Sequence, residues 1–351
     1  MVREFRVDAL GERLRVTVEG MSEADADRLR GQWRRLSFDG EASGTVTVDA
    51  GRGDAAGVHG RDLDEVGVAL RRAINLRAIE ASRGRLLTLH AAGLADPVTG
   101  DVIALVGPSG AGKSTAAAVL GTALGYVSDE TVAVAPSGEV LAFPQPLAFK
   151  LPEGPGKRVM GPDELGLLRP GPRLRLSCVA LLDRTASATV PEIETVGLGD
   201  VVGELVEQVN YFDALPRPLT ALDALVRRCG GVHVIRYREA ADLLEPVRGL
   251  LQASAESATY SRVEPDDWVA LDGATAVLAE SRITVLTPLA ALLWSLLDVP
   301  QPLRRLAAAA EREFGPAPEK GSADAVRAVL GELADAGLVR STRSGRHLAR
   351  D

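Results

Sequence analysis

Cysteine and aromatic residues are scarce in this chain. Its 351 residues include only two cysteines, Cys178 and Cys229, and these show no metal-ligand spacing. A disulfide framework and a cysteine zinc site are therefore excluded, and a reducing compartment is expected. Aromatic residues make up 4% of the chain, which predicts an interior built mainly from aliphatic side chains.

Long apolar runs and an excess of positive charge are also missing. No run approaches the roughly 20 apolar residues that span a bilayer, and charges interrupt the N-terminal sequence MVREFRVDALGERLRVTVEG. We therefore expect a cytoplasmic protein without a membrane partner. Lys and Arg number 40 against 48 Asp and Glu, giving a net charge of −8, so nucleic acid is not an expected partner. The basic tail RSTRSGRHLAR (340–350) is more typical of a solvated chain end than of a DNA contact.

The length favours two or three domains. In residues 1–84, alternating sequence at 4–7 and 14–18 predicts a hairpin, and helical periodicity predicts helices near 23–36 and 62–83. This α+β segment shows no residue pattern that indicates chemistry, so we interpret it as a scaffold. Residues 85–255 alternate buried strands, Gly-rich turns and helices, which is typical of an α/β domain. The polar stretch SAESATYSRVEPDD (254–267) predicts a linker before a third domain at 262–343.

The sequence GPSGAGKS at 107–114 matches the phosphate-binding P-loop pattern between a β-rich run, 102–106, and a helical segment, 113–124. Glycines let backbone N–H groups turn toward phosphate oxygens, and the helix N-terminus favours the same negative charge. Lys113 is expected to reach the β- and γ-phosphates, and the Ser114 hydroxyl to ligate Mg²⁺. The predicted nucleotide-binding residues are Gly107, Pro108, Ser109, Gly110, Ala111, Gly112, Lys113, Ser114 and Thr115, together with Lys150.

A P-loop does not identify a reaction by itself. The chain lacks the guanine-reading N-K-x-D motif and the transporter signature L-S-G-G-Q, which leaves a kinase of small molecules or proteins. The cofactors expected on these grounds are ATP and Mg²⁺.

Three motifs in order, LHAAGLA (89–95), GPSGAGKST (107–115) and GYVSDETVAV (125–134), resemble the HPr kinase/phosphorylase family. That family's P-loop core is related to the core of ATP-dependent phosphoenolpyruvate carboxykinases, so the resemblance implies such a core over about residues 86–250. It also implies that His90 and the pair Asp129–Glu130 lie at the transferred phosphate. The pair is Asp–Glu where the family usually has Asp–Asp, and the family's Arg-containing signature is not found in 191–200, so HPr is not the expected acceptor.

Phosphoryl transfer needs Mg²⁺ and a carboxylate that orients or deprotonates the acceptor hydroxyl. Asp129 and Glu130 supply such groups, although an isolated acidic pair also fits an exposed turn. Asp183 ends the apolar strand 178–182 and competes with Asp129 as the metal ligand; a strand-end turn is its other interpretation. Lys150 lies in a Pro- and Gly-rich excursion, 143–172, that we interpret as an active-site excursion or lid. We expect catalysis from Asp129, His90 and Lys113, and metal ligation from Ser114, Asp129, Glu130 and Asp183.

The C-terminal segment carries a second resemblance. A strand pair followed by LTPLAALLWSLLD, LRRLAAAAEREFG and AVLGELADAGLV, over about 266–341, is similar to the PqqD-like family of small winged-helix-type modules. That family grips leader sequences of ribosomally made peptides, which implies a recognition region at 277–285 through β-augmentation.

The sequence thus predicts an α/β protein with a P-loop core, a small N-terminal α+β domain and a C-terminal winged-helix-like module. Its expected activity is phosphorylation of a peptide or protein hydroxyl, serine above all, in a peptide-modification pathway. The alternative is a nucleotide-binding regulatory scaffold that recruits a leader peptide to another enzyme. The sequence leaves the oligomeric state open, with a homo-oligomer among the alternatives.

Overall fold

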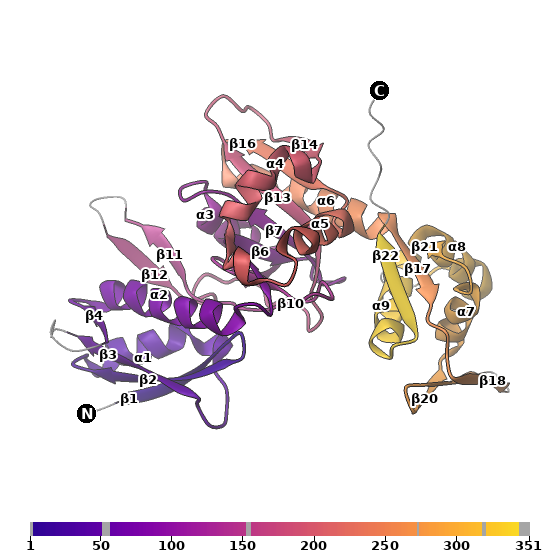
Figure 1. Ribbon diagram of the computed structural model, residues 1–351, viewed down its shortest axis with the longest axis horizontal. Helices are drawn as coiled ribbons and strands as arrows, with labels where there is room; N and C mark the ends of the chain where they lie inside the picture. Colours follow the sequence, from indigo (N-terminus) through magenta and orange to yellow (C-terminus); the bar gives the residue numbers. More distant parts are fainter. Residues whose placement is uncertain (1–2, 51–56, 152–155, 272–273, 318–320, 344–351) are drawn as a thin grey trace. The chain divides into compact units, whose positions relative to one another are not determined.

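The computed structural model describes residues 3–50, 57–151, 156–271, 274–317 and 321–343. The chain divides into two compact units, residues 1–225 with 232–248, and residues 226–231 with 249–351 (Figure 1). Both units combine helices with sheets, which confirms the predicted mixed α/β class. The predicted domain 1–84 and most of the predicted domain 85–255 fall within the first unit, and the division into three domains stays a prediction.

The first unit begins with a four-stranded sheet that two helices accompany. Alternate residues of the first strands, among them Val7, Leu14 and Val16, are fully buried, as the period of a half-buried strand requires. The hairpin pairs antiparallel and the later strands add in parallel, giving the order β1-β2-β3-β4. These elements confirm the predicted hairpin and helices. Their bounds are β1 (Arg3–Ala9), β2 (Glu12–Glu19), α1 (Glu23–Gln32), the 3-10 helix η1 (Arg34–Leu36), β3 (Gly44–Ala50), β4 (Val58–Gly60) and α2 (Leu63–Ser82).

A six-stranded sheet forms the centre of the first unit. Its order is β14-β16-β13-β7-β6-β8, with bounds β6 (Ala91–Ala95), β7 (Asp101–Val106), β8 (Gly125–Ser128), β13 (Arg175–Arg184), β14 (Glu192–Val196) and β16 (Val232–Tyr237). Every residue of β7 is buried, as in a strand covered on both faces. Strands β7, β13 and β16 are parallel. Strand β6 is antiparallel to both β7 and β8, so β8 runs in the direction of β7.

The remaining elements before residue 258 are shorter strands and helices. A second sheet has the order β10-β9-β5-β15. The bounds are β5 (Leu87–Leu89), α3 (Lys113–Leu120), β9 (Val132–Val134), β10 (Val140–Leu141), α4 (Leu198–Glu207), β15 (Val209–Asn210), η2 (Phe212–Ala214), α5 (Pro218–Arg228), η3 (Ala240–Leu243) and α6 (Leu244–Ser257). Helix α3 ends at Leu120, before the predicted end near 124.

The described part of the predicted excursion 143–172 contains a β-hairpin, β11 (Leu147–Lys150) and β12 (Lys157–Met160). The hairpin lies against α2, because a Cβ atom on Gly67 would come within 3.1 Å of Val159. The amide of Val159 also donates a 3.1 Å hydrogen bond to Asp64. A side chain at position 67 would therefore press on Val159, and glycine lets the hairpin lie close to the helix.

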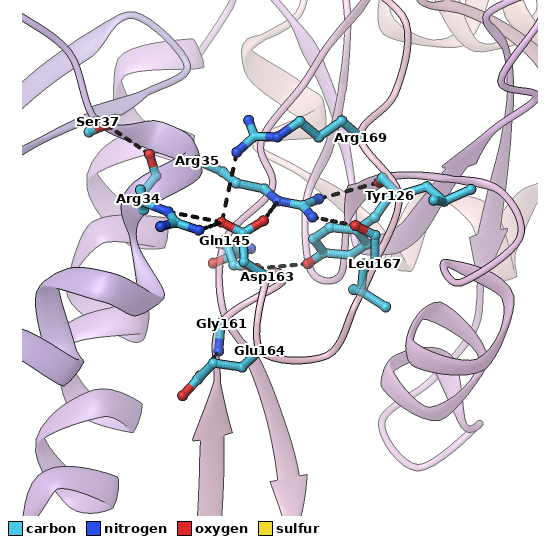
Figure 2. Close-up of polar contacts among 11 residues, drawn as sticks. Arg34, Arg35, Ser37, Tyr126, Gln145, Gly161, Asp163, Glu164, Leu167 and Arg169 are labelled. Atoms are coloured by element: carbon cyan, nitrogen blue, oxygen red, sulfur yellow. Dashed lines mark hydrogen bonds and ion pairs between the residues drawn. The ribbon is translucent and has the colours of Figure 1, made fainter.

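A cluster of arginines around Asp163 fastens the segment after the hairpin (Figure 2). Arg35 donates to Oδ1 of Asp163 at 2.7 Å and Arg34 to Oδ2 at 2.8 Å, while Arg169 forms an ion pair at 3.7 Å. Arg35, whose side chain is 4% exposed, also donates to the carbonyl oxygen of Leu167. Burial raises the pKa of Asp163. The hydrogen bonds from Arg35 and Arg34 together lower it by more, so the net shift of the pKa is downward. Residues 161–169 are therefore held in place by η1.

In its described residues, the second unit contains the ends of α5 and α6, three complete helices, a three-stranded antiparallel sheet of order β18-β19-β20 and a further sheet of order β21-β17-β22. The buried core includes Leu293, Trp294 and Leu330. The bounds are β17 (Ala258–Arg262), β18 (Asp267–Leu271), β19 (Ala274–Ala279), β20 (Arg282–Leu286), α7 (Pro288–Leu296), β21 (Gln301–Pro302), α8 (Leu303–Phe314), α9 (Gly321–Asp335) and β22 (Val339–Arg343).

The linker predicted at 254–267 is wrong over much of its length. Helix α6 continues to Ser257, and strand β17 follows at once. β17 pairs with β22, so that Tyr260 lies opposite Ser341. The pairing partner is distant in the sequence, and a local pattern of polar residues cannot reveal it.

Candidate functional site

The Gly-rich sequence forms a tight loop between β7 and α3, as predicted. Gly110 and Gly112 adopt φ angles of 94° and 91°, a conformation that residues with a Cβ rarely reach. A Cβ on Gly112 would also lie 2.5 Å from the hydroxyl of Tyr237, which donates a hydrogen bond to the carbonyl of Ala111. Strand β16 thus anchors one side of the loop. A Cβ on Gly110 would meet no atom within 4 Å, so the loop is open at that position.

Lys113 begins helix α3, and its side chain returns over the loop. Its ammonium group donates to the carbonyl oxygens of Gly107 and Pro108, the second at 3.1 Å. The residue is 7% exposed. Burial lowers the pKa of Lys113 and the carboxylates of Asp129 and Glu130 raise it; the net shift is downward. A buried cation is therefore held at the N-terminus of α3, with two carboxylates near enough to act on it.

Sheet topology explains why residues distant in sequence gather at the loop. Strands β7, β8 and β13 run in one direction, so their carboxyl ends share one edge of the sheet. The P-loop follows β7, Asp129 follows β8, and Asp183 lies near the end of β13. His90 lies at the same edge. The strand that follows it, β6, is antiparallel to β7, and its first residue, Ala91, pairs with Val106, the last residue of β7.

Asp129 is the buried carboxylate of this edge. It is 2% exposed, and its Oδ2 accepts a 3.0 Å hydrogen bond from Arg71. Burial raises the pKa of Asp129 to about 6, against the lowering effects of Arg71, of the nearby Ser114 hydroxyl and of Lys113. Its Oδ1 is buried and has no hydrogen-bond partner among the described residues. One oxygen of this carboxylate is therefore left for the nearby Ser114 hydroxyl, for another donor or for a cation.

Glu130 shares the same arginine. Its Oε2 lies 2.6 Å from Nη2 of Arg71, and its side chain is 32% exposed. The turn that carries both acids is held by the Thr131 amide, which donates to the Ser128 hydroxyl at 3.3 Å. The Thr131 hydroxyl donates to Asn75 at 2.8 Å. The acidic turn is therefore attached to helix α2 at two places.

Arg71 is the residue at this edge of the sheet that sequence reasoning missed. It lies in the segment 1–84, which showed no pattern indicating chemistry, and it is 9% exposed. Arg71 and Asn75 stand one turn apart on α2, next to the apolar positions Leu70 and Ile74. An arginine at such a position usually belongs to a solvated helix face, so only the tertiary structure reveals the contact.

His90 is half-buried at the start of β6. Its amide donates to the carbonyl of Gln208 at 2.7 Å, which fixes the backbone. Burial lowers the pKa of His90, and the positive charges of Lys113 and Arg71 lower it further, while Glu130 raises it; the net shift is downward. Burial and the nearby positive charges therefore favour the neutral form of the imidazole.

Two of the predicted residues take no part in the contacts around Asp129. Asp183 is exposed and forms an ion pair with Arg236 at 3.6 Å. Lys150 is exposed at the end of β11, opposite Lys157 in the hairpin. The structure thus brings together Lys113, Ser114 and Asp129 with Glu130 and His90.

The donors at this edge suit a cation that arrives with phosphate. Among the described residues, no three His, Cys, Asp or Glu side chains converge as a metal cage. Three groups supply oxygen ligands: the Ser114 hydroxyl, the Glu130 carboxylate and Oδ1 of Asp129, which has no hydrogen-bond partner among the described residues. Mg²⁺ prefers oxygen ligands and usually keeps waters and substrate phosphates in its shell, so a small set of protein oxygens fits it.

The second unit presents an apolar surface on its three-stranded sheet. Val269, Leu271, Ile283 and Val285 are between 49% and 72% exposed, on the two outer strands β18 and β20. Val277, on the central strand β19, is instead fully buried against the helices. Of the predicted recognition region 277–285, the β20 part is therefore the accessible edge.

Residues 267–339 match the PqqD family, described as coenzyme PQQ synthesis protein D, which confirms the predicted resemblance of the C-terminal segment. No curated protein matches the chain. Among solved structures, the chain is similar to the Hpr(Ser) kinase/phosphatase from Coxiella burnetii, with 13% identity and a TM-score of 0.25 over 47% of this chain and 94% of that one. None of the helices in the described ranges has the length and apolar composition that crossing a membrane requires.

Proposed function

We propose that the chain is an ATP- and Mg²⁺-dependent kinase that phosphorylates a hydroxyl, serine above all, of a peptide or small protein. The observation that carries the proposal is the arrangement of Lys113, Ser114 and Asp129 at the carboxyl edge of the central sheet. A phosphate-binding cation, a hydroxyl at a helix N-terminus and a buried carboxylate are the parts that phosphoryl transfer requires.

In this proposal each side chain has a separate role. Lys113 would bind the β- and γ-phosphates, while Ser114 and Glu130, together with Asp129 or Asp183, would hold Mg²⁺, which neutralises phosphate charge when bound. Asp129 orients the acceptor hydroxyl and accepts its proton, since a carboxylate with a pKa of about 6 combines ionisation near pH 7 with some basicity. His90 contacts the acceptor as a neutral imidazole. Asp183 is the replacement metal ligand if Asp129 serves only as the base.

The proposed organisation places catalysis and recognition in different segments. Residues 85–255 form an HPr-kinase-like P-loop core, residues 1–84 the N-terminal domain and residues 262–343 a winged-helix-like module. The match of 267–339 to the PqqD family supports recognition of a leader peptide in a ribosomal peptide pathway. The exposed strand β20 is the proposed edge for this peptide.

One observation favours the alternative function, a nucleotide-binding scaffold without turnover. The single positive charge of Arg71 is shared between Asp129 and Glu130, and a paired carboxylate is a weaker base than a free one. A scaffold would bind nucleotide and leader peptide and would hand the peptide to another enzyme.

Transfer of γ-labelled phosphate separates the two functions. The full chain is incubated with Mg²⁺, γ-labelled ATP and serine-containing precursor peptides with and without their leaders. A kinase labels the peptide, and removal of the leader raises KM more than it lowers kcat. Binding of ATP and of the leader-bearing peptide without any labelled peptide would support the scaffold instead.

A further inference from the structure

One nitrogen of Arg71 bridges both acids of the site. Its Nη2 lies 3.0 Å from Oδ2 of Asp129 and 2.6 Å from Oε2 of Glu130. Two neighbouring carboxylates repel each other, and a cation between them offsets that repulsion and fixes their relative orientation. The same contact occupies oxygens that would otherwise be available to a divalent cation.

The Arg71 bridge lies in the packed interior of the first unit. The Arg71 side chain is 10% exposed, and its Nε is buried without a hydrogen-bond partner among the described residues. Ordering and burying an arginine is costly, and the ion pairs with the two carboxylates offset that cost. Asn75, one turn later on α2, accepts a hydrogen bond from Thr131, so the helix is fixed beside the acidic turn.

We propose that Arg71 is a positioning residue that holds Asp129 and Glu130 in one orientation and competes with divalent cations for their oxygens. Through Arg71, helix α2 then sets the affinity of the site for metal. This inference rests on the proposed function of Asp129 and Glu130 as metal ligands. A dication that binds there must share the carboxylates with the guanidinium. Without Arg71 the site gains affinity for the free metal but loses the orientation of its carboxylates, so metal binding and phosphate transfer change in opposite directions.

Binding of Mn²⁺ alone tests the competition without any turnover. The full chain is titrated with Mn²⁺ by electron paramagnetic resonance at about pH 8, where carboxylates are ionised. Removing a unit positive charge a few ångströms from a dication raises its affinity about tenfold, even with water-like screening. We expect Arg71→Gln to bind Mn²⁺ about tenfold more tightly than the unmodified chain. Arg72→Gln removes an exposed cation from the next position of α2, and its Mn²⁺ affinity should equal that of the unmodified chain.

Arg71→Lys is the second variant and keeps a positive charge. Lysine presents a point charge on a shorter reach than the guanidinium fork, so it satisfies the two carboxylates less well. Its Mn²⁺ affinity should lie between those of the unmodified chain and Arg71→Gln. If Arg71→Gln does not fold, as judged by circular dichroism, Arg71→Lys decides the question. A folded variant with the Mn²⁺ affinity of the unmodified chain overturns the proposal.

Phosphate transfer supplies the second readout. In Arg71→Gln, kcat should fall at least tenfold while KM for ATP stays within about threefold, because Lys113 and the P-loop remain intact. An unchanged kcat overturns the positioning role. If the unmodified chain transfers no phosphate, the proposed kinase function fails, and the order of Mn²⁺ affinities still decides whether Arg71 occupies the acidic pair.

Discussion

The burial of Asp129 predicts a stability that depends on pH. Its pKa is raised from the ordinary 3.8 to about 6, chiefly by burial. The folded chain therefore binds this proton more tightly than the unfolded chain does. The stabilisation is complete below the unfolded value and is lost as the pH rises through about 6. A difference of about two pKa units, at ~1.4 kcal/mol each, corresponds to ~3 kcal/mol.

The substitution Asp129→Asn removes this titration and keeps the shape of the side chain. We expect the free energy of unfolding of the variant, relative to that of the unmodified chain, to rise by roughly 2–3 kcal/mol between about pH 4 and pH 7. Urea denaturation of metal-free protein at several pH values measures the difference. Asp183→Asn is the matched control, because it removes an exposed carboxylate at the same sheet edge. For this control, the free energy of unfolding relative to that of the unmodified chain should vary by less than about 1 kcal/mol over the same pH range.

A flat difference for Asp129→Asn over this pH range would refute the reasoning. It would mean that the pKa of the carboxylate is not raised in the folded chain, because the group keeps its hydration or because Arg71 offsets the burial. The raised pKa on which its role as a base rests would then be wrong. A change of opposite sign would mean that Arg71 outweighs the burial.

Three other substitutions test separate parts of the structure. Lys113→Ala should raise the calorimetric Kd of Mg-ATP about 100-fold, the value of a charged phosphate contact, while the exposed control Lys157→Ala leaves it unchanged; equal Kd values would contradict the P-loop role. Asp163→Ala leaves the buried Arg35 guanidinium without its carboxylate and should lower the free energy of unfolding by about 3 kcal/mol in urea, and a loss below about 1 kcal/mol would argue against the arginine cluster. Ile283→Asp should raise KM for a leader-bearing peptide about tenfold without changing ATP binding, in contrast to the exposed control Leu76→Asp, and an unchanged KM would argue against recognition at β20.

Local patterns were sufficient for the parts of the site that are contiguous in sequence. The glycines, Lys113 and Ser114 form one loop and one helix turn, so their spacing predicts their geometry. The helical period of residues 62–83 likewise predicted helix α2, which the structure contains. The family resemblance added Asp129 and His90, which topology then brings to the same sheet edge.

Contacts between distant segments were beyond local reasoning. Nothing in the sequence around Arg71 distinguishes it from a solvated helix residue, and its partners lie 58 and 59 positions later. The polar sequence of strand β17 predicts a linker, because the partner strand β22 follows some 80 residues later and a local pattern does not include it. Asp183 is exposed and pairs with Arg236, a residue of another strand, and the sequence pattern of β13 alone does not predict this.

The central claim is that Asp129 acts on the acceptor hydroxyl during phosphoryl transfer. The most direct test is a single-turnover measurement in which γ-labelled ATP, bound with Mg²⁺ to excess enzyme, is mixed with a serine-containing peptide. We predict that the unmodified chain labels the peptide and that Asp129→Asn does so at least about 100-fold more slowly, with ATP still bound. Labelling by Asp129→Asn at the rate of the unmodified chain would contradict the account.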